Sequence, residues 1–183
     1  MEPNNLYHIY NRGNNRVRIF YTRENYLFFI QKITKYISPH VDILAYCLMP
    51  NHFHLMVLTK GSYEQSGFSN DLRILLSSYT RAINSQNNWI GSLFQQNTKF
   101  KSLEDANDPE YPFTCFHYIH QNPVQAGLVN RFEEWEMSSF VDYAGLRNET
   151  ICNKKLASLH LDIPETPELF IKQAYGIQII SEF

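Results

Sequence analysis

The chain has 183 residues, of which 44% are hydrophobic and 19% are charged, a balance typical of one globular domain and not of a disordered chain. Its net charge is −2, so the chain is not basic overall. Residues 1–60, however, hold seven Lys or Arg against three acidic residues. DNA binding needs only such a local basic patch. Three widely spaced cysteines, no signal-peptide pattern and no apolar run of bilayer length predict a cytoplasmic protein without a membrane partner.

The first sixty residues alternate between strand and helix patterns. Apolar and polar residues alternate over 5–11, which predicts a strand. Residues 23–37 place their apolar side chains at helical spacing and predict a helix. Two β-rich runs, 41–49 and 53–59, follow on either side of Pro50, and this arrangement predicts a hairpin.

The second part of the chain predicts two longer helices. A loop is expected over 61–68, and the polar residues at 69–71 offer an N-cap for a helix over 71–87. Residues 93–103 are expected to be extended. A further helix is predicted over 109–122, with the proline at 123 as its stop, and the tail beyond about residue 150 has a helical pattern.

The order strand, helix, strand, strand, helix, strand predicts an α+β fold of the ferredoxin-like βαββαβ type, a sandwich with an antiparallel sheet. Extra C-terminal helices are expected to follow. We expect one face of the sheet to remain open, where it could carry a site. We assign residues 1–145 to one domain and residues 146–183 to a C-terminal helical extension of that domain.

His52 and His54 are the first candidate site residues. Side chains alternate between the two faces of a strand, so both imidazoles point the same way while Phe53 points into the core. Two imidazoles side by side can bind one metal ion. The alternative is a pair of solvent-facing histidines on an edge strand.

Tyr118 and Asn122 form the second candidate group. They lie four residues apart on the predicted helix and therefore share a face. A tyrosine beside a carboxamide is interpreted as a nucleophile next to a third metal ligand, with Gln121 as the competing ligand. The alternative is that Tyr118 packs in the core while Asn122 only ends the helix.

Basic side chains are candidates for DNA contacts, with a solvated surface charge as the alternative for each. They form two groups: Arg12, Arg16 and Arg18 in the first basic loop, and Arg81, Lys99 and Lys101 further along. His8 could support a site from the first strand but is interpreted as a packed or surface residue. His117 and His120 do not share the face of Tyr118 and Asn122, and no role is assigned to them.

Several segments occur together in a characteristic order. They are YHIYNRGNN (7–15), IFYTRENYLFF (19–29), MPNHFHLMV (49–57), SYTRAIN (78–84), LFQQNTKFKS (93–102), YIHQNPVQAGLV (118–129) and SSFVDYAG (138–145). Through them the chain resembles the single-tyrosine transposases of the HUH class, named for histidine, hydrophobic residue, histidine. The Asn-Pro-Val and Ser-Ser-aromatic elements resemble those of the REP-associated branch. The resemblance covers roughly residues 5–145.

This resemblance implies a metal-dependent single-stranded DNA endonuclease and strand transferase. Tyr118 would be the nucleophile that forms a 5′-phosphotyrosine link. His52, His54 and Asn122 would hold Mg²⁺ or Mn²⁺. The partner would be single-stranded or hairpin DNA, and the protein would act as a monomer or a homodimer.

Two other functions remain open at this stage. A water-activating metal-dependent phosphodiesterase could use the same histidines without Tyr118 as nucleophile. A catalytically inactive hairpin-DNA-binding protein could keep the fold without the reaction, although the presence of all four candidate residues argues against decay of the site.

Overall fold

A four-stranded antiparallel sheet forms the centre of the computed structural model, which describes residues 1–104 and 108–177. The strand order is β2-β3-β1-β4. The strands are β1 (Leu6–Arg12), β2 (Val41–Met49), β3 (His52–Thr59) and β4 (Lys99–Ser102).

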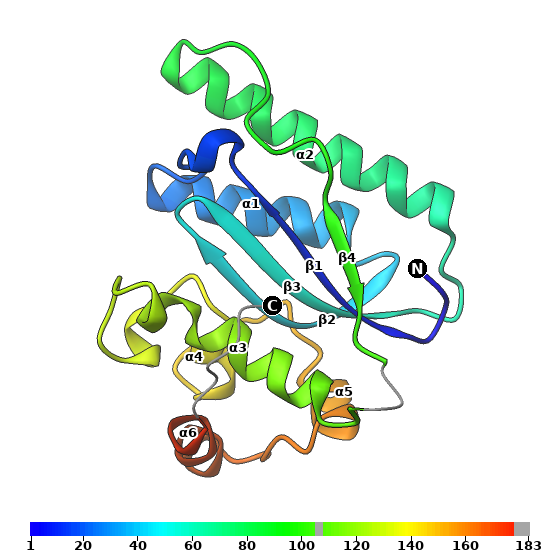
Figure 1. Ribbon diagram of the computed structural model, residues 1–183, viewed down its shortest axis with the longest axis vertical. Coiled ribbons are helices and arrows are strands. Elements are labelled where there is room, and N and C mark those ends of the chain that lie inside the picture. Colours follow the sequence, from blue (N-terminus) through cyan, green and yellow to red (C-terminus); the bar gives the residue numbers. More distant parts are fainter. Residues whose placement is uncertain (105–107, 178–183) are drawn as a thin grey trace.

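Helices cover both faces of this sheet. The helices α1 (Arg23–Tyr36) and α2 (Gln65–Asn87) lie on one face, and α3 (Tyr111–Gln125) crosses the other (Figure 1). The strands and α-helices up to β4 follow the order β1-α1-β2-β3-α2-β4, which confirms the predicted ferredoxin-like α+β fold. The face that we expected to be open is instead covered in part by α3, which packs on β2 and β3.

Short helices follow α3 and lie on its side of the sheet (Figure 1). They are η2 (Phe132–Glu134), α4 (Phe140–Tyr143), α5 (Lys154–His160) and α6 (Pro167–Gly176), and a further short helix, η1 (Asn14–Arg16), follows β1. The end of the expected extension, residues 178–183, lies outside the described residues. No helix in the described ranges is both long enough and apolar enough to span a bilayer.

The start of α2 corrects one prediction. We expected a loop over 61–68 and an N-cap at 69–71, but the helix begins at Gln65, and the side chain of its N-cap residue, Glu64, makes no capping hydrogen bond. Phe68 is fully buried and lies at helical spacing from Leu72. It therefore extends the apolar stripe of the helix by a turn.

The end of α3 corrects a second prediction. Pro123 was expected to stop this helix, yet it lies inside α3, which continues to Gln125. The proline lies in the last turn, where its missing N–H removes only one hydrogen bond. The turn still closes, because Ala126 N donates to Asn122 O at 2.9 Å. The extended segment expected over 93–103 is a strand only at Lys99–Ser102, with an isolated bridge between Gly13 and Phe94.

The outer edge of β2 is paired with the segment 137–139. Leu48 N donates to Met137 O, and Ser139 N donates to Tyr46 O, each at 2.9 Å. An edge strand that is covered in this way cannot pair with another chain.

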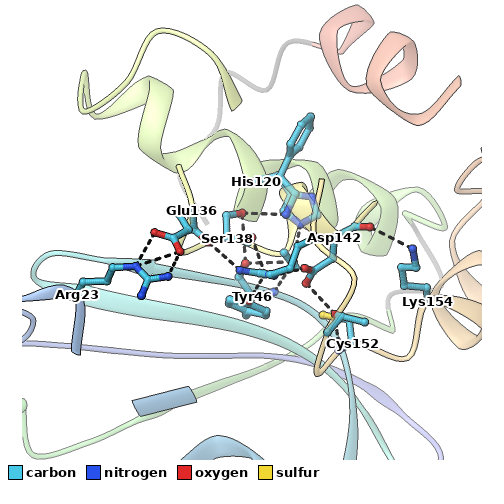
Figure 2. Close-up of polar contacts among 12 residues, drawn as sticks. Arg23, Tyr46, His120, Glu136, Ser138, Asp142, Cys152 and Lys154 are labelled. Carbon is cyan, nitrogen blue, oxygen red and sulfur yellow. Dashed lines mark hydrogen bonds and ion pairs between the residues drawn. The ribbon is translucent and has the colours of Figure 1, made fainter. Parts of the chain in front are cut away.

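A buried polar network connects the segment 137–139 to the sheet and to α3 (Figure 2). Asp142 is fully buried and pairs with Arg147 at 2.6 Å, and Arg147 also donates to the hydroxyl of Tyr46. The hydroxyl of Ser139 accepts from Tyr46 N at 2.8 Å and contacts Nε2 of His120 at 2.7 Å. This contact links α3, the helix that carries Tyr118, to the segment at the edge of the sheet.

Candidate active site

The pairing of β1 with β3 brings the candidate residues to one face of the sheet. In this register Arg12 lies opposite His52, and Tyr10 lies opposite His54. Directly opposed residues of an antiparallel pair share a face. Phe53 points to the other face and contacts Phe29 of α1, with ring centroids 5.2 Å apart.

Between this face and α3 lies a cavity of about 220 Å³. It is lined by Tyr10, Asn11, Arg12, His52, His54, Tyr118 and Asn122. The ring of Tyr118 stands edge-on to that of His54, with centroids 5.7 Å apart. One cavity therefore contains the predicted nucleophile and all three predicted metal ligands.

The two carboxamides on α3 face different surroundings. Asn122 Nδ2 donates to Tyr118 O at 2.8 Å, and its side chain lines the cavity together with His52. Gln121 does not line this cavity, and its Nε2 donates to Ile177 O at 2.7 Å. Of the two candidate third ligands, the structure places only Asn122 at the site.

A hydrogen-bond partner lies beside each candidate imidazole. His52 Nδ1 is 2.6 Å from Asn51 Oδ1, and His54 Nδ1 is 2.8 Å from His8 Nε2. His8 is fully buried, as the packed interpretation requires, but its contact with His54 was not foreseen. The alternation of β1 places it on the site face, whereas its distance to His54 depends on a strand pairing that the sequence does not state.

The electrostatics of the site keep its imidazoles neutral. Burial, together with the charge of Arg12, lowers the pKa of His52 to about 4, and the nearby Asn122 side chain partly offsets this. Burial lowers the pKa of His8 to about 3 and that of His54 well below its usual value. Neutral imidazoles are the form that binds metal ions.

The donor set of the cavity fits a divalent cation. Nε2 of His54 is buried and has no hydrogen-bond partner within the described part of the chain. Such an orphaned nitrogen needs a partner, and a metal ion can be one. Within the same ranges no three His, Cys, Asp or Glu side chains form a metal cluster, so a metal at this position would depend on two imidazoles and a carboxamide, with open positions for substrate.

The structure separates the predicted basic groups. Arg12 lines the site cavity, and Arg18 lines a second cavity of about 430 Å³ next to Pro50. Arg16 is exposed in η1. The second group is divided: Lys99 and Lys101 of β4 lie opposite Tyr10 and His8, on the site face, whereas Arg81 belongs to α2 on the other face.

The remaining histidines of α3 lie away from the cavity. His117 is fully buried and contacts the ring of Phe113, with centroids 4.6 Å apart. His120 is buried against Ser139. Neither lines the site cavity.

Comparison with known proteins identifies relatives. The sequence model of one family, described as "Transposase IS200 like", matches residues 3–122. A solved structure of a REP-associated tyrosine transposase bound to a REP hairpin shares the fold, with a TM-score of 0.61 and 20% sequence identity over 82% of this chain and 85% of that chain. The comparison with curated proteins gives no match.

Proposed function

Because the chain belongs to the IS200-like transposase family, we propose that it cuts and rejoins single-stranded DNA through a covalent link between Tyr118 and a 5′ phosphate. The observation that carries this proposal is the convergence of Tyr118, His52, His54 and Asn122 on one cavity. The similar structure is bound to a REP hairpin, which supports hairpin DNA as the partner.

The proposed reaction exchanges one phosphate ester for another. The hydroxyl oxygen of Tyr118 attacks phosphorus, and the bond from phosphorus to the 3′ oxygen breaks. The phenol loses a proton and the departing 3′ oxygen gains one. The tyrosyl ester keeps the energy of the broken bond, so a 3′-hydroxyl of another strand can later displace Tyr118 and join the strands without a nucleotide cofactor.

The other lining residues act on charge and position. His52, His54 and Asn122 would hold Mg²⁺ or Mn²⁺, which, when bound, polarises the scissile phosphate and neutralises the charge that develops on its oxygens. Arg12 lines the same cavity, and its charge reaches His52. Arg12 can therefore contact a phosphate oxygen and hold the strand beside Tyr118.

The proposal is tested with end-labelled hairpin DNA that carries a single-stranded flank, incubated with the protein and Mn²⁺ and analysed on a denaturing gel. We expect a protein–DNA adduct with the unaltered chain and none with Tyr118→Phe, because phenylalanine has no oxygen to form the ester. Tyr36→Phe, at the end of α1 on the other face of the sheet, is the control and should form the adduct.

Each alternative function predicts a different set of products on the denaturing gel. Cleavage by Tyr118→Phe without an adduct would favour the water-activating phosphodiesterase. Hairpin binding by the unaltered chain with neither cleavage nor adduct would favour the inactive binding protein. An adduct with Tyr118→Phe would assign the nucleophile to another residue.

A further inference from the structure

The contact between His8 and His54 joins two buried imidazoles. His8 is fully buried and His54 is 4% exposed. Their rings stack with centroids 5.0 Å apart, and Nε2 of His8 lies 2.8 Å from Nδ1 of His54. A hydrogen bond between two neutral imidazoles requires one nitrogen to donate and the other to accept. The contact therefore ties the position of the proton on one ring to its position on the other.

Only one of the two arrangements suits a metal ligand. If His54 Nδ1 donates, its Nε2 keeps a lone pair at the cavity, while the hydrogen of His8 lies on Nδ1, which has no hydrogen-bond partner in the described ranges. If His8 Nε2 donates instead, His54 Nε2 carries a hydrogen, and this nitrogen has no acceptor among the described residues. Within the described part of the structure, each arrangement leaves one buried donor without a partner, but only the first turns a lone pair toward the cavity, where a cation satisfies it.

The other candidate imidazole has the same arrangement. Nδ1 of His52 faces Asn51 Oδ1 at 2.6 Å. An amide oxygen can only accept, so His52 Nδ1 donates and Nε2 retains its lone pair. Ligating histidines commonly donate their second N–H to such a partner, which fixes the ring and its tautomer.

We propose that His8 is a positioning residue, which accepts the proton of His54 Nδ1 and holds His54 Nε2 ready for the cation. This inference rests on the proposed function, because it takes His54 as a metal ligand. His8 itself does not line the cavity. It would act through His54 alone, as Asn51 acts through His52.

Three variants of the full chain test this role by their affinity for Mn²⁺, measured by calorimetry without DNA. His8→Phe removes the acceptor, and we expect its affinity to fall by about tenfold to a hundredfold. His8→Gln can place an amide oxygen near the former Nε2, and it should retain most of the affinity. His117→Phe replaces another fully buried histidine away from the cavity and should bind Mn²⁺ as the unaltered chain does.

The tautomer of His54 gives a second readout that needs no metal. Long-range proton–nitrogen NMR spectra of ¹⁵N-histidine-labelled protein should show the hydrogen on Nδ1 of His54 in the unaltered chain and in His8→Gln. His8→Phe should lose this preference. The signals of His54 are assigned by their disappearance in His54→Gln.

Several results would overturn the role of His8 without contradicting the proposed reaction of Tyr118, which the denaturing gel tests separately. These are equal Mn²⁺ affinity in His8→Phe and the unaltered chain, an equal loss in His117→Phe, or a hydrogen on Nε2 of His54 in the unaltered chain. If His8→Phe does not fold, the Mn²⁺ affinity of His8→Gln and the NMR spectrum of the unaltered chain still test whether His8 positions His54. Absence of Mn²⁺ binding by the unaltered chain would overturn both this role and the proposed metal site.

Discussion

Two carboxamides that are adjacent in sequence make different contacts on α3. Asn122 lines the cavity together with His52, while Gln121 Nε2 donates to Ile177 O at 2.7 Å. We therefore expect Asn122→Ala to weaken Mn²⁺ binding by about tenfold or more, equivalent to about 1.4 kcal/mol or more, because it removes the carboxamide oxygen that is proposed to bind the metal. Calorimetry on the metal-free protein measures the change.

Gln121→Ala is the matched control for this variant. It removes a carboxamide from the same turn of the same helix, but from a side chain that does not line the cavity. Its Mn²⁺ affinity should equal that of the unaltered chain. If Gln121→Ala loses Mn²⁺ affinity and Asn122→Ala does not, the third metal ligand is Gln121 and not Asn122.

Local periodicity could predict much of the site. Strand alternation placed His52 and His54 together, and helical spacing placed Tyr118 with Asn122. The contact of His8 with His54 could not be predicted, because it depends on the pairing of β1 with β3. Such a contact between distant positions comes from tertiary structure and not from the pattern of either strand.

The basic side chains proposed for DNA contacts lie on both sides of the sheet. Arg12 of β1 and the two lysines of β4 lie on the site face, and Arg81 lies on α2 across the sheet. We expect Arg12→Gln to reduce the slope of log affinity for hairpin DNA against log salt concentration by about 0.7 to 0.9, which corresponds to one phosphate contact. Titrations of labelled hairpin DNA at several salt concentrations measure this slope.

Arg81→Gln makes the same change of charge on the opposite face. Its slope should match that of the unaltered chain, because a strand bound at the cavity does not reach α2. Equal slopes for all three proteins would remove Arg12 from the DNA contacts. A reduced slope in Arg81→Gln alone would move the binding surface to the helical face.

At the level of elements, the order was easier to predict than the boundaries. The alternating and helical patterns predicted all six elements of the ferredoxin-like order. The predicted start of α2 is wrong because the sequence pattern assigns Phe68 to a loop, whereas its burial against the core extends the helix. Pro123 was taken as a stop, yet a proline in the last turn costs one hydrogen bond, which the buried surface of α3 offsets.

Burial favours the neutral form of several histidines in the described part of the chain. Burial lowers the pKa of five described histidines: His8, His52, His54, His117 and His120. In the unfolded chain each titrates near pH ~6.5. Acid therefore favours the unfolded state, which can take up protons that the folded state excludes.

His117 gives the clearest test of this effect, because it lies outside the proposed metal site. Burial lowers its pKa from 6.5 to about 4, so its contribution to stability is complete above pH 6.5 and is lost as the pH falls toward 4. At about 1.4 kcal/mol for each pH unit, the full loss is about 3 kcal/mol. Urea unfolding of the metal-free chain should show a lower free energy of unfolding at pH 4.5 than at pH 7.

In His117→Phe one of these titrations is absent, and the fall in the free energy of unfolding between pH 7 and pH 4.5 should be smaller by about 2 kcal/mol. The comparison uses the difference between the two pH values, so a change in packing that is the same at both pH values cancels. His160→Phe, at the end of α5, should show the same fall as the unaltered chain. An equal fall in all three proteins would mean that His117 takes up its proton without opening the core.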